Sequence, residues 1–163
     1  MIEAFEPQFK EEWYRMMGKK LGFQQVGRSE KELVDRLITW MEKTKADYTN
    51  TFLVIANPKQ KPLYFKTDEE FHNWHKEWRD RIESDHYGLS EARKKMVQVN
   101  PLYIPRNHLV EEALTEAGNG GDFAKFFSLL DTLKQPYQRN WKSTDLQRVP
   151  SGFDENYKTY CGT

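Results

Sequence analysis

The sequence predicts an all-α fold, an irregular bundle of about six to seven helices with an extended C-terminal arm. Three observations predict this class. Apolar residues recur every three or four positions over most of residues 1–136, which is the spacing of one buried helix face. Capping residues precede several of these stretches, and prolines or glycines separate them. The apolar run 52–55, rich in β-branched residues, has no second strand pattern to pair with.

Two helices are expected near the N-terminus. In the first, Pro7 fits the first turn, and Gly22 closes the end through a left-handed conformation. Its apolar stripe contains Phe5, Phe9, Trp13, Met16, Met17 and Leu21. Ser29-Glu30-Lys31-Glu32 is a capping box, in which Ser29 and Glu32 each bond the other's backbone amide. The buried face of the second helix contains Leu33, Val34, Leu37, Trp40 and Met41.

The segment that follows is ambiguous between helix and strand. Asp47-Tyr48-Thr49-Asn50-Thr51 offers several helix caps, whereas the β-branched residues of Phe52-Leu53-Val54-Ile55 favour a strand. With helices on both sides, we interpret the segment as a short helix, and residues 57–62 as a loop.

Two more helices are predicted before residue 100. Thr67-Asp68-Glu69-Glu70 is another capping box. The helix that it opens has an apolar side made of Phe71, Trp74, Trp78 and Ile82. A shorter helix is expected over residues 90–97.

Two further helices are predicted beyond residue 100. Pro101 prevents the preceding helix from continuing, because proline disfavours α geometry in the residue before it. Residues 106–117 carry Leu109, Val110, Ala113 and Leu114 at helical spacing, and residues 118–121 are expected to break that helix. Asp122 is expected to cap the last helix, whose apolar face contains Phe123, Phe126, Phe127, Leu130 and Leu133.

The periodicity disappears from Tyr137 onward, although the tail keeps Trp141, Phe153, Tyr157 and Tyr160. These are too many aromatic residues for a solvated linker, so we expect part of the tail to lie against the helical body. The sequence shows no clear boundary inside the helical part. The expected organisation is therefore a helical domain over 1–136 and an irregular arm over 137–163.

The composition excludes several classes of protein. The 25 basic and 25 acidic residues cancel, so no overall field favours nucleic acid or an anionic membrane. No run approaches the roughly 20 apolar residues of a membrane span. The first residues also lack the basic and apolar regions of a secretory signal. With a single cysteine, these features predict a reducing, cytoplasmic environment.

Candidate sites for chemistry are weak. His72 and His75 lie three residues apart and would reach one metal ion, which leaves a metal-dependent hydrolase as one alternative, but solvated histidines are the commoner case. The glycine-rich segment 118–121 precedes a helix N-terminus without a P-loop lysine, and Asp122 would repel phosphate. Ser128 and Ser143 lack an identifiable base. We therefore expect no catalytic, nucleotide or metal site in this chain.

The segment 100–107 is the most specific stretch of the sequence. Two prolines restrain its backbone, two asparagines can bridge turns, and Arg106 offers a planar set of donors. We interpret it as a brace between helices rather than a ligand contact. Its expected structural residues are Asn100, Pro101, Tyr103, Arg106 and Asn107.

Cys161 stands third from the C-terminal residue of this sequence and has no partner within it. An inert terminal thiol is the commoner case for such a residue. A thiol on an accessible arm can, however, react with another domain or with an oxidant.

Several motifs in one order resemble the C-terminal part of the selenoprotein O (YdiU) family. The resemblance extends over essentially the whole chain. It rests on residues 19–22, 47–52, 100–107, 121–123 and 133–137, and on Cys161. The family has a protein-kinase-like fold that transfers AMP from ATP to protein hydroxyls with a divalent metal, Mg or Mn. The resemblance implies that the nucleotide and metal residues belong to a preceding kinase-like domain, so no catalytic residue is assigned here.

The resemblance also implies a redox role for Cys161, which aligns with the family's cysteine or selenocysteine near the C-terminus. In that family the position forms a disulfide with the catalytic domain. Gly162-Thr163 replaces the commoner Ser-Ser, which changes the surroundings of the thiol. The partners implied are the kinase-like domain of the same polypeptide and the protein substrates, without nucleic acid or membrane. A free-standing helical interaction module without enzymatic activity is the alternative.

Overall fold

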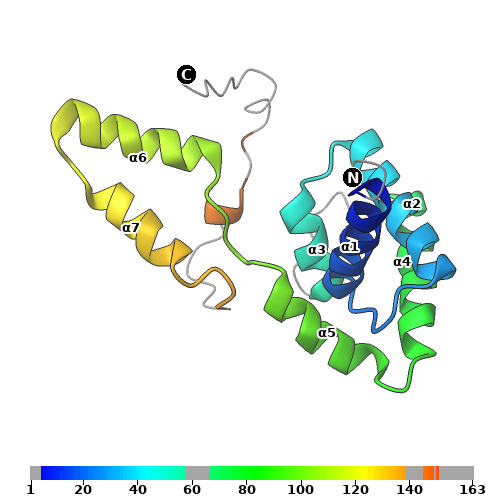
Figure 1. Cartoon of the computed structure of the whole chain (residues 1–163). Helices are drawn as coiled ribbons and strands as arrows, with labels where there is room; N and C mark the ends of the chain where they lie inside the picture. The colour runs from blue at the N-terminus through cyan, green and yellow to red at the C-terminus, as the bar shows by residue number, and fades with distance from the viewer. Residues whose placement is uncertain (1–4, 58–66, 139–144, 149, 151–163) are drawn as a thin grey trace. The chain divides into compact units, whose positions relative to one another are not determined.

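The computed structural model describes residues 5–57, 67–138, 145–148 and 150. Within these residues the chain forms seven α-helices, one short 3-10 helix and no strand, which confirms the all-α class. The chain divides into two compact units, unit 1 (Met1–Pro101) and unit 2 (Leu102–Thr163), which Figure 1 shows with α1 to α5 in the first and α6 and α7 in the second. The division into a helical domain 1–136 and an arm 137–163 stays a prediction.

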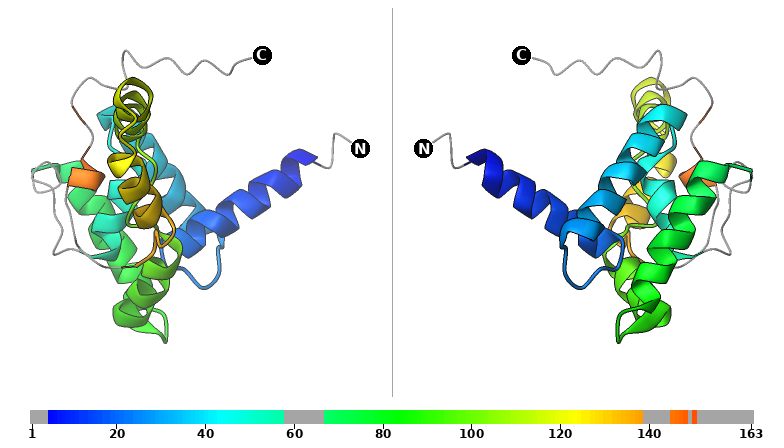
Figure 2. Two further views of the ribbon diagram at one scale, coloured as in Figure 1. Left: turned by 90° about the vertical axis from the view of Figure 1, so that its left-hand side faces the viewer. Right: turned by 90° about the vertical axis from the view of Figure 1, so that its right-hand side faces the viewer.

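Helix α1 (Phe5–Lys20) is anchored at its C-terminal end. Met17 and Leu21 have no exposed surface, whereas Phe5 is 66% and Phe9 57% exposed. The prediction of a stripe buried along the whole helix is therefore wrong for its first half, which extends beyond the other helices of unit 1 (Figure 2). The apolar spacing of this half is helical, but none of the described elements of unit 1 covers it. Gly22 ends the segment with a φ of 78°, as expected.

Helix α2 (Arg28–Thr44) begins two residues earlier than the predicted capping box required. Its N-cap is Gly27, whose backbone N–H donates to Oε2 of Glu30 at 2.8 Å. Glu30, rather than Glu32, thus supplies the carboxylate that reaches back to the cap. Ser29 instead donates its hydroxyl to Glu30 at 2.9 Å. The physical reason is that Glu30 is buried and also bonds Arg81, while Glu32 lies on the exposed side of the helix.

Helix α3 (Tyr48–Ala56) confirms the helical interpretation of the ambiguous segment. Asp47 is its N-cap and accepts a hydrogen bond from the Asn50 amide at 2.7 Å. Every residue from Thr51 to Ala56 is buried, so burial on all sides explains the continuous apolar run that resembled a strand. Most of the predicted loop 57–62 lies outside the described residues.

Helix α4 (Glu69–Glu83) buries the four predicted residues Phe71, Trp74, Trp78 and Ile82. Its N-cap is Asp68, which accepts from the Phe71 amide at 2.8 Å, so the cap lies one residue beyond the predicted Thr67. Helix α5 (Gly88–Val99) contains the predicted helix 90–97 and extends it at both ends.

Buried tryptophans hold the helices of unit 1 together. The indole N–H of Trp78 donates to the Leu21 carbonyl at 2.9 Å, and that of Trp74 donates to the Leu33 carbonyl at 2.8 Å. The indole N–H of Trp40 donates to the Asp68 carboxylate at 3.0 Å. Because a buried indole N–H needs a partner, these bonds fix α4 against the end of α1 and against α2.

In unit 2, α6 (Asn107–Gly120) runs farther than predicted. It continues through the glycine-rich segment and ends at Gly121, whose φ is 66°. Helix α7 (Ala124–Leu133) returns beside α6 (Figure 1), and a 3-10 helix, η3 (Asp145–Gln147), follows. The N-cap of α7 is Phe123, while Asp122 bonds the Ala124 amide from one position earlier, at 2.9 Å.

The apolar residues of α6 are partly buried, whereas the predicted apolar face of α7 is largely exposed. In α6, Ala113 is buried, Leu109 and Val110 are half-buried and Leu114 is 52% exposed, and α7 has no fully buried residue among those described. A buried apolar face is therefore wrong for α7 within the described residues. The hairpin supplies two amphipathic helices but too little opposing surface to cover them.

A charged group is buried between α2 and α4. Glu30 is 3% exposed and bonds Arg81, which also pairs with Asp85. Burial alone would raise the pKa of the Glu30 carboxyl. Hydrogen bonds from Arg81, Ser29 and the Gly27 amide outweigh burial and hold that pKa below its ordinary value.

We predict that Glu30→Gln lowers the free energy of unfolding at pH 7 by about 2 kcal/mol, because Arg81 loses its buried partner. The matched control is Glu32→Gln, which breaks an exposed ion pair with Arg28 and should change stability by less than about 0.5 kcal/mol. Urea unfolding followed by circular dichroism measures both. Equal effects of the two substitutions would contradict this assignment.

The stability difference between wild type and Glu30→Gln should also depend on pH. A carboxyl whose pKa is lower in the folded state stabilises above its unfolded pKa, and that contribution is lost as the pH falls through the folded value. The difference should therefore be constant above about pH 5 and shrink below about pH 4. A difference that stays constant from neutral pH to pH 3 would contradict the lowered pKa.

Candidate functional site

Three of the sequence motifs meet in unit 1 around the side chain of Lys20. Lys20 ends α1, Tyr48 and Phe52 lie on α3, and Asn100 caps the C-terminus of α5. The Lys20 ammonium lies 5.3 Å from the centre of the Tyr48 ring and 5.1 Å from that of Phe52. It also donates to Oδ1 of Asn100 at 3.3 Å. We call these four residues the Lys20 cradle.

Asn100 bonds both the side chain and the backbone of Lys20. Its Nδ2 donates to the Lys20 carbonyl at 2.8 Å, so the two residues bond each other reciprocally. Asn100 is 1% exposed, which makes the loss of either bond costly. The pair ties the end of α1 to the end of α5 and fixes where the following Pro101 begins.

Burial shifts the ionisation of two members of the cradle. It lowers the pKa of the Lys20 ammonium and raises the pKa of the Tyr48 phenol. The Tyr48 hydroxyl lies 3.3 Å from the sulfur of Met17. Cation–π contacts and a side-chain amide can hold the lysine in place, but the described cradle contains no carboxylate to act as a base. Its geometry suits structural support rather than acid–base catalysis.

Residues 102–107 of the segment belong to unit 2. The backbone N–H groups of Leu102 and Tyr103 donate to the Pro136 carbonyl, at 2.7 and 3.4 Å. Arg106 is 9% exposed, and its Nη2 lies 3.5 Å from the Gln147 carbonyl. These contacts join the start of the unit to the turn after α7 and to η3. Asn107 is the first residue of α6 and is exposed. The role of the five predicted residues as a brace stays a prediction.

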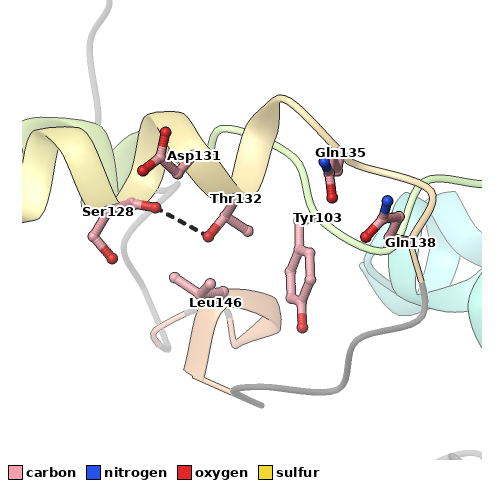
Figure 3. Close-up of a pocket in the computed structure, with 7 residues that line it drawn as sticks. All are labelled: Tyr103, Ser128, Asp131, Thr132, Gln135, Gln138 and Leu146. Carbon is pink, nitrogen blue, oxygen red and sulfur yellow. Dashed lines mark hydrogen bonds between the residues drawn. The ribbon is translucent and has the colours of Figure 1, made fainter.

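A small pocket in unit 2 lies beside Tyr103 (Figure 3). It has a volume of about 290 Å³. Its lining residues are Tyr103, Ser128, Asp131, Thr132, Gln135, Gln138 and Leu146. Hydroxyl and amide groups therefore surround an aromatic ring, and the one carboxylate, Asp131, pairs with Lys134 at 2.8 Å. No cation is among the described lining residues, so the pocket offers a nucleotide phosphate no charge partner.

The predicted histidine pair does not form a metal centre in the part of the chain that the structure describes. Nδ1 of His72 lies 3.2 Å from the Asp68 carbonyl, at the start of α4. The His75 ring lies against Phe71 and Trp78, with centroids 5.9 and 5.1 Å away. Over the described residues, no three His, Cys, Asp or Glu side chains come together as a metal site would require.

The other sequence candidates are either separated or outside the described residues. Ser128 lines the pocket, and no histidine is among the described residues around it. Ser143 and Cys161 lie outside the described residues. The sequence analysis did not predict the Lys20 cradle. One feature of the sequence could have indicated it: Lys20, Tyr48 and Asn100 all lie in segments that carry the family resemblance. None of the described helices is long and apolar enough to cross a membrane.

Comparisons with known proteins agree on one family. The family model described as "Protein adenylyltransferase SelO" matches residues 1–134. The match includes the Lys20 cradle and both helices of unit 2's hairpin, and it ends before Cys161.

Relatives match almost the whole chain. The chain is 36% identical to the "Protein nucleotidyltransferase YdiU" of Nitrosococcus oceani over 164 residues, which cover 99% of this chain and 33% of that protein. It is 37% identical to the protein of the same name from Bacillus cytotoxicus over 162 residues, with the same two coverages. The chain thus spans about a third of the length of the curated relatives that it matches.

We predict that Asn100→Ala lowers the free energy of unfolding of unit 1 by about 1–3 kcal/mol, because the Lys20 carbonyl and ammonium both lose a partner. Asn73→Ala is the control, since Asn73 is exposed on α4 and should change stability by less than about 0.5 kcal/mol. Urea unfolding measures both variants. If the two substitutions have the same effect, Asn100 does not hold the cradle together.

Proposed function

Because this chain belongs to the protein adenylyltransferase SelO family, we propose that it is the helical C-terminal region of a protein adenylyltransferase. The whole protein would transfer AMP from ATP to Ser, Thr or Tyr hydroxyls of other proteins. The observation that supports this proposal most is the length of the relatives. They match 99% of this chain but are about three times as long. The remaining two thirds leave room for a kinase-like domain that binds ATP and Mg or Mn.

In this proposal the chain supports the kinase-like domain and supplies no catalytic residue. Unit 1 is suited to support, because its tryptophans and the Lys20 cradle fix five helices around one core. The pocket in unit 2 is polar without a cationic lining residue among those described, which does not favour a nucleotide site there. The proposed partners are the kinase-like domain and the protein substrates, in the cytoplasm, without nucleic acid or membrane.

The proposal includes a redox role for Cys161. Its thiol would form a disulfide with a cysteine of the kinase-like domain and close the arm across the catalytic cleft. Two thiols would lose two protons and two electrons to a small-molecule disulfide, which becomes two thiols. Reduction would reopen the cleft, so the bond would bias a two-state opening.

The alternative is a free-standing helical interaction module without enzymatic activity. The exposed apolar residues of α7 fit a partner in either proposal, so they do not separate the two. The two proposals differ in whether this chain needs the rest of the family's polypeptide. The C-terminal region of an adenylyltransferase acts beside a kinase-like catalytic domain, whereas a free-standing module acts without one.

AMP transfer tests the proposal most simply. We predict that the longer polypeptide, incubated with labelled ATP and Mg or Mn, transfers label to protein, and that residues 1–163 alone transfer none. The same preparation without metal is the control. Transfer of AMP by the isolated chain, or no transfer by the longer polypeptide, would contradict the proposal.

We further predict that Cys161→Ser removes the redox dependence of AMP transfer. Oxidation should slow the longer wild-type polypeptide severalfold and reductant should restore it, while the variant keeps the reduced rate under both conditions. The reduced wild type is the control for intact catalysis. If the wild type transfers AMP at equal rates with and without reductant, the redox role is wrong. That result would not contradict the AMP-transfer proposal.

A further inference from the structure

The last helix, α7, is amphipathic; among the described residues it half-buries Leu129 and Leu133 and leaves most of its other apolar side chains exposed. Phe127 is 56% exposed, Phe126 37% and Leu130 39%, and the N-cap residue Phe123 is 50% exposed. We call these four residues the α7 patch. Helix α7 has 10 residues, which is too short to be stable in water without packing on an apolar face. Helix α7 packs on α6, and this packing leaves the four side chains of the α7 patch for another surface to cover.

The α7 patch is one continuous surface rather than scattered residues. The ring centres of Phe123 and Phe126 lie 6.5 Å apart, those of Phe123 and Phe127 6.2 Å, and those of Phe126 and Phe127 5.6 Å. Leu130 stands one helical turn beyond Phe126 and Phe127, on the same side. Clustered aromatic residues of this kind characterise interaction sites, where they supply most of the binding energy.

The charges beside the α7 patch are already paired with one another. Lys125 bonds Glu116 at 2.5 Å and lies 3.5 Å from Glu112, and Lys134 pairs with Asp131. Because Lys125 faces two glutamates, the charge beside the patch is net negative, which disfavours a nucleic acid or an anionic lipid surface. The patch itself fits an apolar protein face.

We propose that the α7 patch docks onto the part of the family's longer polypeptide that this chain does not contain. This inference rests on the proposed function. It follows from the length of the relatives, of which about two thirds lie outside the matched region. A partner in the same polypeptide has a high effective concentration, so a patch of four side chains suffices to hold it. A second copy of the chain would need a larger surface to associate at cellular concentrations.

Hydrogen exchange tests the docking directly. In the longer polypeptide, the amides of residues 124–133 should exchange at least about 10-fold more slowly than in the isolated chain, because the covered helix opens less often. Phe127→Ser in the longer polypeptide should reverse this protection by about 10-fold, since it removes one buried aromatic side chain. The control is Tyr87→Ser, because Tyr87 is 52% exposed in unit 1 and should leave residues 124–133 unchanged.

The outcomes separate this inference from the proposed function. Equal exchange of α7 in the two polypeptides, or no effect of Phe127→Ser, would overturn the docking even if AMP transfer is intact. Protection that appears in the isolated chain and rises with its concentration would also overturn it, in favour of a second copy. Slow exchange of α7 without any AMP transfer would support the docking while removing the proposed function. Exchange of the α4 amides, unchanged in each variant, shows that unit 1 is folded.

Discussion

The hydrogen bond from the Trp78 indole to the Leu21 carbonyl is the constraint on which the rest of unit 1 depends. Trp78 has no exposed surface, so its N–H must find a partner inside the protein. The partner lies where α1 ends, and this places Gly22 against α5, where an added Cβ would lie 3.0 Å from Ala92. The same α1 end carries Lys20, whose bonds to Asn100 then fix the exit of the chain from this unit.

Unit 2 differs from unit 1 in how its helices are stabilised. Unit 1 has a core of tryptophan, phenylalanine and aliphatic side chains, and its helices are capped by Gly27–Glu30, Asp47 and Asp68. The helices of unit 2 bury Ala113, half-bury Leu109, Val110, Leu129 and Leu133, and leave Leu114, Phe126, Phe127 and Leu130 exposed. A hairpin with so small a core gains stability from a neighbouring surface that covers the exposed side chains, in keeping with the docking proposed above.

The sequence predicted the helices of unit 1 closely, because their apolar spacing and capping residues act locally. It placed the buried face of α4 correctly at Trp74 and Trp78. Two predictions were wrong because they depended on residues far away in the sequence. The carboxylate that caps α2 is Glu30, because Arg81 bonds it. The apolar face of α7 is exposed, because no described element covers it. The Lys20 cradle was not foreseen either, since a contact over 80 positions leaves no local pattern. Cys161 lies outside the described residues, so the redox role proposed for it rests on the family resemblance alone.

In the proposed function, this chain supports a nucleotide-dependent enzyme without binding the nucleotide itself. Calorimetric titration of the isolated chain with ATP and Mg is the decisive measurement. We expect no binding heat at ATP concentrations up to about 1 mM. Saturable binding with a Kd below roughly 100 µM would contradict it, because the nucleotide site would then belong to this chain.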